Sequence, residues 1–182
     1  MAELETRPAA RRKTPRKISP RYLENAALFH LKRYSTSVKQ LRRVLLRKTA
    51  RSMRHHGGDK AQATGWIDEL LVKLQRNGLL NDESFAKNRA HSLRASGKSS
   101  RMITMKLREK GVSSEHVQHA VKDATSEVSE EDAAFRHAQR RRLGPYRAAA
   151  LRKERREKDL AALARAGFSF AIARKVIDSQ VE

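Results

Sequence analysis

Leu107-Arg-Glu-Lys-Gly111-Val112-Ser113 returns further along the chain as Leu163-Ala-Arg-Ala-Gly167-Phe168-Ser169. In each copy an apolar stretch runs into a glycine, which readily adopts the left-handed conformation that ends many helices. A serine then stands where the next helix needs an N-cap. The phrase therefore predicts helix, tight turn and helix at two places. A supersecondary unit that recurs in this way indicates stacked helical modules rather than one active site.

The repeat continues into the helix that follows each glycine. When the two glycines are aligned, apolar positions coincide in pairs: Val117, Ala120 and Val121 match Ala173, Val176 and Ile177. A third, less regular copy precedes them, in which Leu45 matches Leu107 and Leu163, and Thr49 replaces the glycine. The sequence thus predicts an all-α fold of three tandem three-helix modules in an elongated array.

The composition agrees with helices and narrows the class of protein. Of 182 residues, 38% are hydrophobic, 5% aromatic and 34% charged, a balance typical of helical surfaces. There is no cysteine, which excludes disulfides and thiolate metal sites. No apolar stretch approaches the roughly 20 residues that cross a bilayer, and no signal segment follows the first residue. We therefore expect a cytoplasmic protein without a membrane partner.

Breaks in the apolar periodicity suggest the domain organisation. Residues 1–20 combine prolines with a cluster of cations and predict a disordered basic arm. The first module is expected over residues 21–80, with an inserted loop near residues 51–64 that contains His55-His56-Gly57-Gly58. The second covers residues 81–126, and the third covers residues 127–182 with a basic linker at 143–158.

The excess of positive charge is the main indication of a partner. Lysine and arginine number 41 against 20 acidic residues, a formal net charge of +21. Such an excess favours a polyanion, since neutralised phosphates release counterions on binding. The cations concentrate within residues 25–58, which hold no acidic residue, and within residues 140–158. The simpler alternative is a solvated helix exterior.

Helical spacing selects the cations that we expect to contact the partner. On the second predicted helix the cations at intervals of four lie opposite the apolar face, and the same arrangement recurs in the second module. The candidate contact residues are Lys39, Arg43, Arg47, Arg101, Arg108, Arg155 and Arg156. Trp66 and Phe85 follow leucine spacing and are expected in the core, whereas Tyr34 is the better candidate for stacking on a base.

No catalytic or metal-binding constellation is evident. His55 and His56 are adjacent and have only Asp59 nearby, and the acids Glu130, Glu131 and Asp132 fit the positive end of a helix dipole. Gly57-Gly58 lacks the surroundings of a phosphate loop. We therefore expect no enzyme activity, no cofactor and no metal.

The middle of the chain resembles a known family. Residues 78–86, Gly-Leu-Leu-Asn-Asp-Glu-Ser-Phe-Ala, then Lys98-Ser-Ser-Arg101-Met-Ile103 and residues 107–113 are similar to the central signature of the RecX regulatory proteins. The resemblance implies tandem three-helix modules in an elongated, curved monomer. It also implies binding to RecA and to the RecA filament on single-stranded DNA, with restraint of strand exchange, ATP hydrolysis and repressor cleavage.

Two other functions are compatible with the same charges. A sequence-independent or helix-turn-helix protein would bind DNA phosphates directly and without RecA. A passive helical-repeat scaffold would bind an acidic protein instead. These alternatives make different predictions about filaments, naked DNA and salt.

Overall fold

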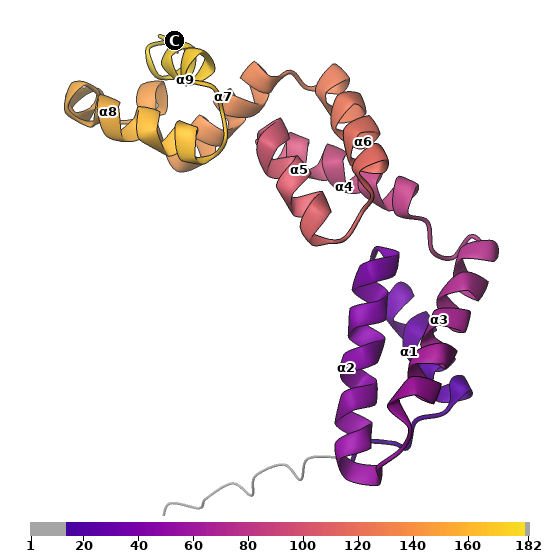
Figure 1. The fold of residues 1–182 in the computed structure, drawn as a ribbon. Coiled ribbons are helices and arrows are strands. Elements are labelled where there is room, and N and C mark those ends of the chain that lie inside the picture. Colours follow the sequence, from indigo (N-terminus) through magenta and orange to yellow (C-terminus); the bar gives the residue numbers. More distant parts are fainter. Residues whose placement is uncertain (1–13, 181–182) are drawn as a thin grey trace, which may run out of the picture.

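The computed structural model describes residues 14–180 (Figure 1). Within these residues the chain forms nine α-helices and one short 3-10 turn and contains no strand, which confirms the predicted all-α class. The helices are α1 Pro20–Leu31, α2 Val38–His56, α3 Lys60–Arg76, α4 Asp82–Ala95, α5 Ser100–Glu109, α6 Ser114–Glu127, α7 Glu130–Arg141, α8 Ala149–Arg165 and α9 Phe170–Ile177, with the 3-10 turn η1 at Gly144–Tyr146.

Serine side chains begin most of these helices, as the sequence predicts. Ser37, Ser99, Ser113 and Ser169 each stand at an N-cap and accept a hydrogen bond from a backbone N–H of the following turn. Asn81 does the same for α4. These bonds satisfy N–H groups that a helix leaves without an internal partner, so each boundary is fixed locally.

Three separate clusters of buried apolar residues divide the described chain. The N-terminal cluster gathers α1, α2 and α3 around Leu23, Leu41, Leu45, Ile67 and Leu74. The central cluster, from Phe85 to Ala124, joins α4, α5 and α6. The C-terminal cluster, from Ala133 to Ile177, joins α7, α8, α9 and η1. Each cluster falls inside one of the three segments that the sequence suggests, although their independence as modules stays a prediction.

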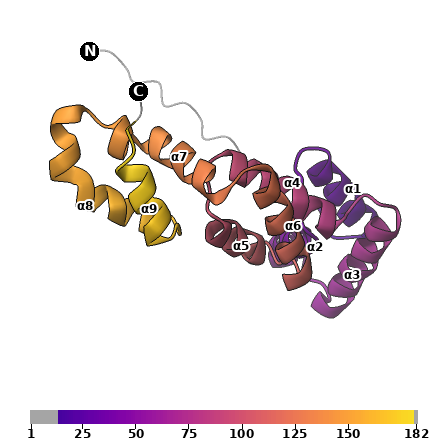
Figure 2. The same cartoon turned by 90° about the horizontal axis from the view of Figure 1, so that it is seen from above.

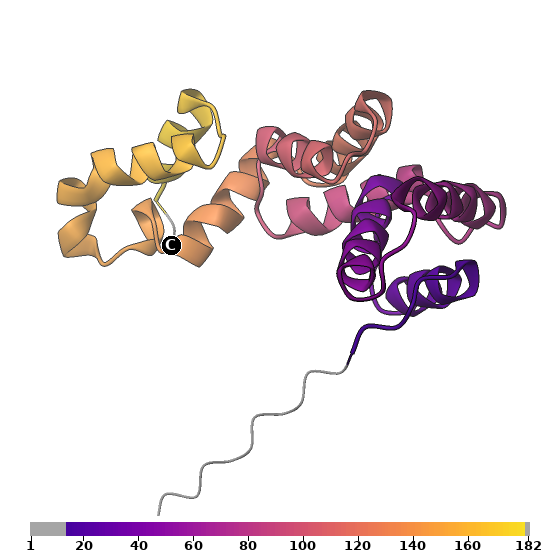
Figure 3. The same ribbon diagram turned by 60° about the horizontal axis from the view of Figure 1, so that its bottom comes forward.

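The clusters follow one another along a bent path, with the N-terminal cluster at one end and the C-terminal cluster at the other (Figure 1). The views from above and from below keep this order (Figures 2 and 3). Each cluster contacts its neighbour in sequence, and the described chain is elongated. A long surface of this kind is suited to an extended partner.

The prediction of an inserted loop near residues 51–64 is wrong. Helix α2 continues to His56, and only Gly57, Gly58 and Asp59 separate it from α3. The stretch is polar, but it holds no helix breaker before Gly57, whose φ is +67°. Buried Ser52 also extends the inner face of α2 and donates a hydrogen bond to the carbonyl of Arg16 over 2.7 Å.

The same bond shows that the prediction of a disordered arm over residues 1–20 is wrong for its last residues. Residues 1–13 lie outside the described residues, but residues 14–19 run along the end of α2. The carbonyl of Pro15 lies 2.6 Å from His56 Nε2, and Ile18 packs against the N-terminal cluster. Order therefore starts before Ser19.

The predicted basic linker at residues 143–158 is mostly helix. Only residues 142–148 connect α7 to α8, and the first half of α8 contains much of the predicted linker. Alanine, leucine, arginine, lysine and glutamate are good helix formers, so the charge of this stretch does not interrupt the helix. Arg152 holds the connection by donating to the carbonyls of Arg147 and Pro145, over 2.9 and 2.7 Å.

Candidate functional site

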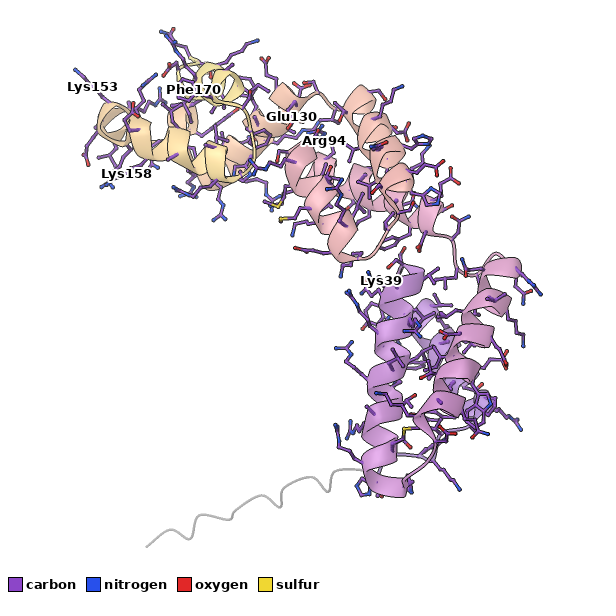
Figure 4. The ribbon with its side chains drawn as sticks, viewed as in Figure 1. Lys39, Arg94, Glu130, Lys153, Lys158 and Phe170 are labelled. Atoms are coloured by element: carbon purple, nitrogen blue, oxygen red, sulfur yellow. The ribbon has the colours of Figure 1, made fainter. Side chains whose placement is uncertain are left out.

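The cations selected from the sequence lie on three helices, α2, α5 and α8. Lys39, Arg43 and Arg47 are exposed on α2, and Arg101 and Arg108 are exposed on α5. Lys39 lies at the end of α2 that faces the central cluster (Figure 4). Lys39 and Arg43 also contact the central cluster, since the Lys39 side chain packs against Gly111 and Arg43 Nη1 donates to the carbonyl of Glu109 over 3.2 Å.

The two candidates on α8 are engaged in ion pairs. Arg155 Nε lies 3.2 Å from Glu154 Oε1. Arg156 makes a two-pronged pair with Asp178, with both N–O distances 2.7 Å, and also contacts Glu157. The bond to Asp178 raises the pKa of Arg156 and lowers the pKa of Asp178. Arg156 thus links α8 to the residue after α9 and is less available to a partner than the cations of α2 and α5.

The junction between the N-terminal and central clusters is built on an N-cap serine. Ser37 Oγ accepts a bond from the N–H of Gln40 in its own helix and donates one to the carbonyl of Lys110, at the end of α5. The N–H of Val38 donates to Asp82 Oδ1 over 2.8 Å. One fully buried hydroxyl therefore starts α2 and ends α5.

The junction between the central and C-terminal clusters repeats these contacts. Ser99 Oγ accepts from the N–H of Met102 and donates to the carbonyl of Ala166 over 2.6 Å. The N–H of Ser100 donates to Glu130 Oε1 over 3.1 Å. Ser99, like Ser37, is fully buried. The N-terminus of α2 thus meets the C-terminus of α5, and the N-terminus of α5 meets the C-terminus of α8 in the same way. Helix dipoles favour both contacts.

The two glycines of the repeated phrase lie inside these junctions. Gly111 has a φ of +82° and Gly167 a φ of +91°, both in the region that favours glycine. A Cβ on Gly111 would collide with the side chain of Lys39, and a Cβ on Gly167 would lie 2.6 Å from Ser99 Oγ. The glycines therefore end one helix and also admit the first turn of a helix from the preceding cluster.

A buried arginine strengthens the second junction. Arg94, at 1% exposure, pairs with Glu130 Oε2 over 2.7 Å and donates to Ser100 Oγ and Thr125 Oγ1 over 2.7 and 2.6 Å. Figure 4 shows Arg94 and Glu130 together where the central and C-terminal clusters meet. Helical spacing gives no signal for this pair, because an arginine in the last turn of a polar helix is ordinarily a surface residue.

Helices α4 and α6 are joined by a titratable contact. His91 Nε2 lies 2.9 Å from Asp123 Oδ2, and Nδ1 lies 2.8 Å from Glu127 Oε2. The bond to Asp123 raises the pKa of His91, burial opposes this shift, and the bond to Glu127 adds to it. The positively charged ring can donate to both carboxylates at once, whereas the neutral ring can donate to only one.

This contact predicts a stability that depends on pH. A histidine whose folded-state pKa is raised adds to the free energy of unfolding. This stabilisation is complete below the unfolded pKa of roughly 6.5 and is lost as the pH rises through the raised folded-state pKa. His91→Gln is therefore expected to lower the free energy of unfolding more at about pH 5.5 than at about pH 9. Urea unfolding followed by circular dichroism measures both values. His119→Gln, an exposed change on α6, is the control, and an equal loss at both pH values for His91→Gln would contradict the prediction.

Two general features of the described residues bear on function. Within residues 14–180 no group of three or more histidine, cysteine or acidic side chains is arranged to hold a metal ion. No helix in that range is long and apolar enough to span a membrane.

Comparisons with known proteins place the chain in a family. Residues 81–121, which cover most of the central cluster, match the family model described as RecX, second three-helix domain. A "Regulatory protein RecX" of Myxococcus xanthus is 61% identical over 168 residues, which are 92% of this chain and 90% of the relative. The chain belongs to the RecX family.

More distant RecX proteins extend the comparison. One of Agrobacterium fabrum is 33% identical over 88% of this chain and 84% of its own length. One of Lactococcus lactis is 30% identical over 64% of this chain and 43% of its own length. No solved structure gives a significant match. The matched residues 81–121 include Ser99 and Gly111, one from each junction.

Proposed function

We propose that this chain binds RecA and the RecA filament on single-stranded DNA, and that it inhibits the recombinase, ATPase and coprotease activities of RecA in DNA repair and the SOS response. Membership of the RecX family supports a regulatory role on RecA. The proposal assigns no catalytic residue to the chain, and it takes the active form as a cytoplasmic monomer.

The repeated junction is the observation that carries the proposal. Buried hydrogen bonds from Ser37 and Ser99 hold three clusters end to end, and α2 and α5 carry exposed cations. A stiff array of this kind presents several weak contacts at fixed spacing along a partner that is itself a repeating polymer. Multivalent contact then adds avidity without requiring a tight individual site.

A filament assay tests the proposal directly. The chain is added to preformed RecA filaments on single-stranded DNA, and DNA-dependent ATP hydrolysis is followed together with cosedimentation. We expect saturable binding and reduced hydrolysis at less than one chain per RecA, since a regulator that bridges neighbouring subunits affects more than one. Unchanged hydrolysis at saturating chain, with no cosedimentation beyond that on naked DNA, would contradict the proposal.

A second experiment tests which cations contact the filament. Arg43→Glu with Arg47→Glu is expected to weaken filament binding by about tenfold and to leave helicity intact. Lys60→Glu with Arg76→Glu makes the same charge change on α3 and is the matched control. Arg155→Ala with Arg156→Ala is expected to act more mildly on binding, because Arg156 is held by Asp178. Equal binding by the α2 variant and its control would remove α2 from the interface.

A further inference from the structure

A surface groove lies beside each junction. The first groove has a volume of about 500 Å³ at the junction of the central and C-terminal clusters and is lined by Lys98, Met102, His137, Arg141 and Arg165 among others. The second, of about 440 Å³, lies at the junction of the N-terminal and central clusters, and its lining includes Arg33, Tyr34, Gln40, Arg89 and Lys110. We name them the C-terminal groove and the N-terminal groove.

The two grooves occupy equivalent positions in the repeat. Gln40 and Met102 each accompany the N-cap serine of α2 or α5, to which they donate their backbone N–H. Arg89 and His137 stand at the same position of α4 and α7, counted from Asp82 and Glu130. Lys110 is the C-cap of α5, and its counterpart Ala166 is the C-cap of α8 and also lines the C-terminal groove. The junction geometry thus places a groove at the same position of the repeat twice, and the cations that line the two grooves come from different positions.

Both grooves are cationic and lack a counter-charge. Three cations line each one. In the N-terminal groove they are Arg33, Arg89 and Lys110, and in the C-terminal groove they are Lys98, Arg141 and Arg165. No carboxylate lines either groove, and none of these six side chains forms an ion pair within the described residues. Elsewhere in the chain arginines pair with acids, as Arg42 does with Asp68.

The surroundings of His137 reflect this concentration of positive charge. Burial lowers the pKa of His137, a bond with the Gly97 backbone opposes the shift, and the charges of Lys98, Arg141 and Arg140 lower the pKa further. Cations held together without a counter-charge repel one another, and a bound anion would relieve that repulsion.

Aromatic side chains mark the edge of the N-terminal groove. Tyr34 is 58% exposed, and the neighbouring Phe29 is 59% exposed with the Arg33 guanidinium 4.3 Å from its ring centre. Large exposed rings among unpaired cations are the combination that binds single strands, because cations contact the backbone and rings stack on bases. A base in a duplex is already stacked on its neighbours and is not free to stack on Tyr34.

We propose that the two junction grooves bind the phosphate backbone of one single strand of nucleic acid, with Tyr34 as a stacking platform for a base. The strand follows the repeat from one groove to the next, so that the two sites act together. This binding requires no RecA and therefore goes beyond the proposed function.

Fluorescence anisotropy without RecA tests the proposal, using a labelled oligothymidine of ~20 nucleotides, a length that covers more than one binding site of ordinary size. Arg89→Glu and Arg165→Glu change one groove each, and each is expected to weaken binding by about tenfold. Their combination should weaken binding by more than either single change. The dependence of log affinity on log salt should become shallower by about 0.7 for each lost phosphate contact.

Matched variants make the test specific to the grooves and the ring. Arg76→Glu carries the same charge change on α3, outside both grooves, and is expected to act weakly. Tyr34→Ala should weaken binding by about tenfold with an unchanged salt slope, and Tyr34→Phe should bind as the parent chain does. Circular dichroism confirms that each variant is folded.

Two results would overturn the proposal. One is binding by Arg89→Glu and Arg165→Glu that equals binding by Arg76→Glu. The other is a duplex of the same length that binds as tightly as the single strand and is weakened equally by Tyr34→Ala. Because RecA is absent from these assays, either failure leaves the filament experiment unaffected.

Discussion

Glu130→Gln is expected to lower the free energy of unfolding by about 3 kcal/mol, within the range for removing one partner of a buried ion pair. The change keeps the size of the side chain and can keep a bond to Ser100, but it removes the negative charge opposite Arg94. Arg94 is only 1% exposed, and its Nε has no hydrogen-bond partner. The guanidinium would therefore stay buried without a counter-charge.

A double-mutant cycle separates the ion pair from the rest of the junction. Arg94→Met with Glu130→Gln removes the buried charge as well as its partner, and we expect it to recover part of the stability lost in Glu130→Gln alone. Glu131→Gln is the matched control, since Glu131 is the neighbouring residue and pairs with Lys175 on the surface. It should cost at most about 1 kcal/mol.

Urea unfolding followed by circular dichroism gives these free energies, and hydrogen exchange locates the change. The Ser100 N–H, which donates to Glu130, should exchange faster in Glu130→Gln than in the parent chain. A loss of less than about 1 kcal/mol for Glu130→Gln would show that Arg94 finds other compensation and that the pair does not stabilise the junction.

The helices and their cores could be predicted because they depend on local patterns. Leu45, Leu107 and Leu163 were aligned by their spacing from a turn, and all three are fully buried in the structure. The serine caps and terminal glycines also act within one turn of their own helix. Local signals of this kind require no knowledge of how distant residues meet.

The junctions could not be predicted because they join residues far apart in the chain. Nothing near Ser99 indicates that its hydroxyl donates to Ala166, 67 residues away. The cap of α5 was predicted, but its second bond depends on the placement of another cluster. The grooves follow from the junctions, so helical spacing predicts exposed cations but selects neither Arg89 nor Arg165.

Composition was also a poor guide to the ends of α2 and α8. Residues 51–56 are rich in cations and histidine, yet they continue α2 because Ser52 falls on its buried face. In α8 the predicted basic linker ends one residue before Asp159. This acid follows a stretch rich in cations and is nevertheless only 2% exposed. Charge along a sequence does not tell which charged residue turns inward, since that choice depends on the partner that it meets.

The buried carboxylate Asp159 carries the second large prediction. Its oxygens accept two bonds from Arg147, over 3.0 and 2.7 Å, and one from the Gly144 N–H over 2.9 Å. Burial opposes ionisation, but the Arg147 and Gly144 bonds hold the pKa of Asp159 below its usual value. The carboxylate, within α8, thereby holds η1 and Arg147 of the connection against the C-terminal cluster.

Asp159→Asn is expected to lower the free energy of unfolding by about 3 kcal/mol near neutral pH, because Arg147 loses its charge partner and the amide nitrogen, in either orientation, faces a donor that a carboxylate oxygen accepts. Since the folded-state pKa of Asp159 is depressed, its contribution is present above the unfolded pKa of roughly 3.9 and is lost as pH falls through the folded value. The difference between parent and variant should therefore shrink in acid. Chemical unfolding over this pH range and exchange of the Gly144 N–H measure both effects.

Asp178→Asn tests whether burial, rather than the ion pair alone, causes the loss. Asp178 makes a two-pronged pair with Arg156 of similar geometry, but both side chains are more than a third exposed. Water can solvate either group after the change, so we expect a loss of at most about 1 kcal/mol. Equal losses for Asp159→Asn and Asp178→Asn would contradict the argument, because both carboxylates pair with an arginine through two bonds and only Asp159 is buried.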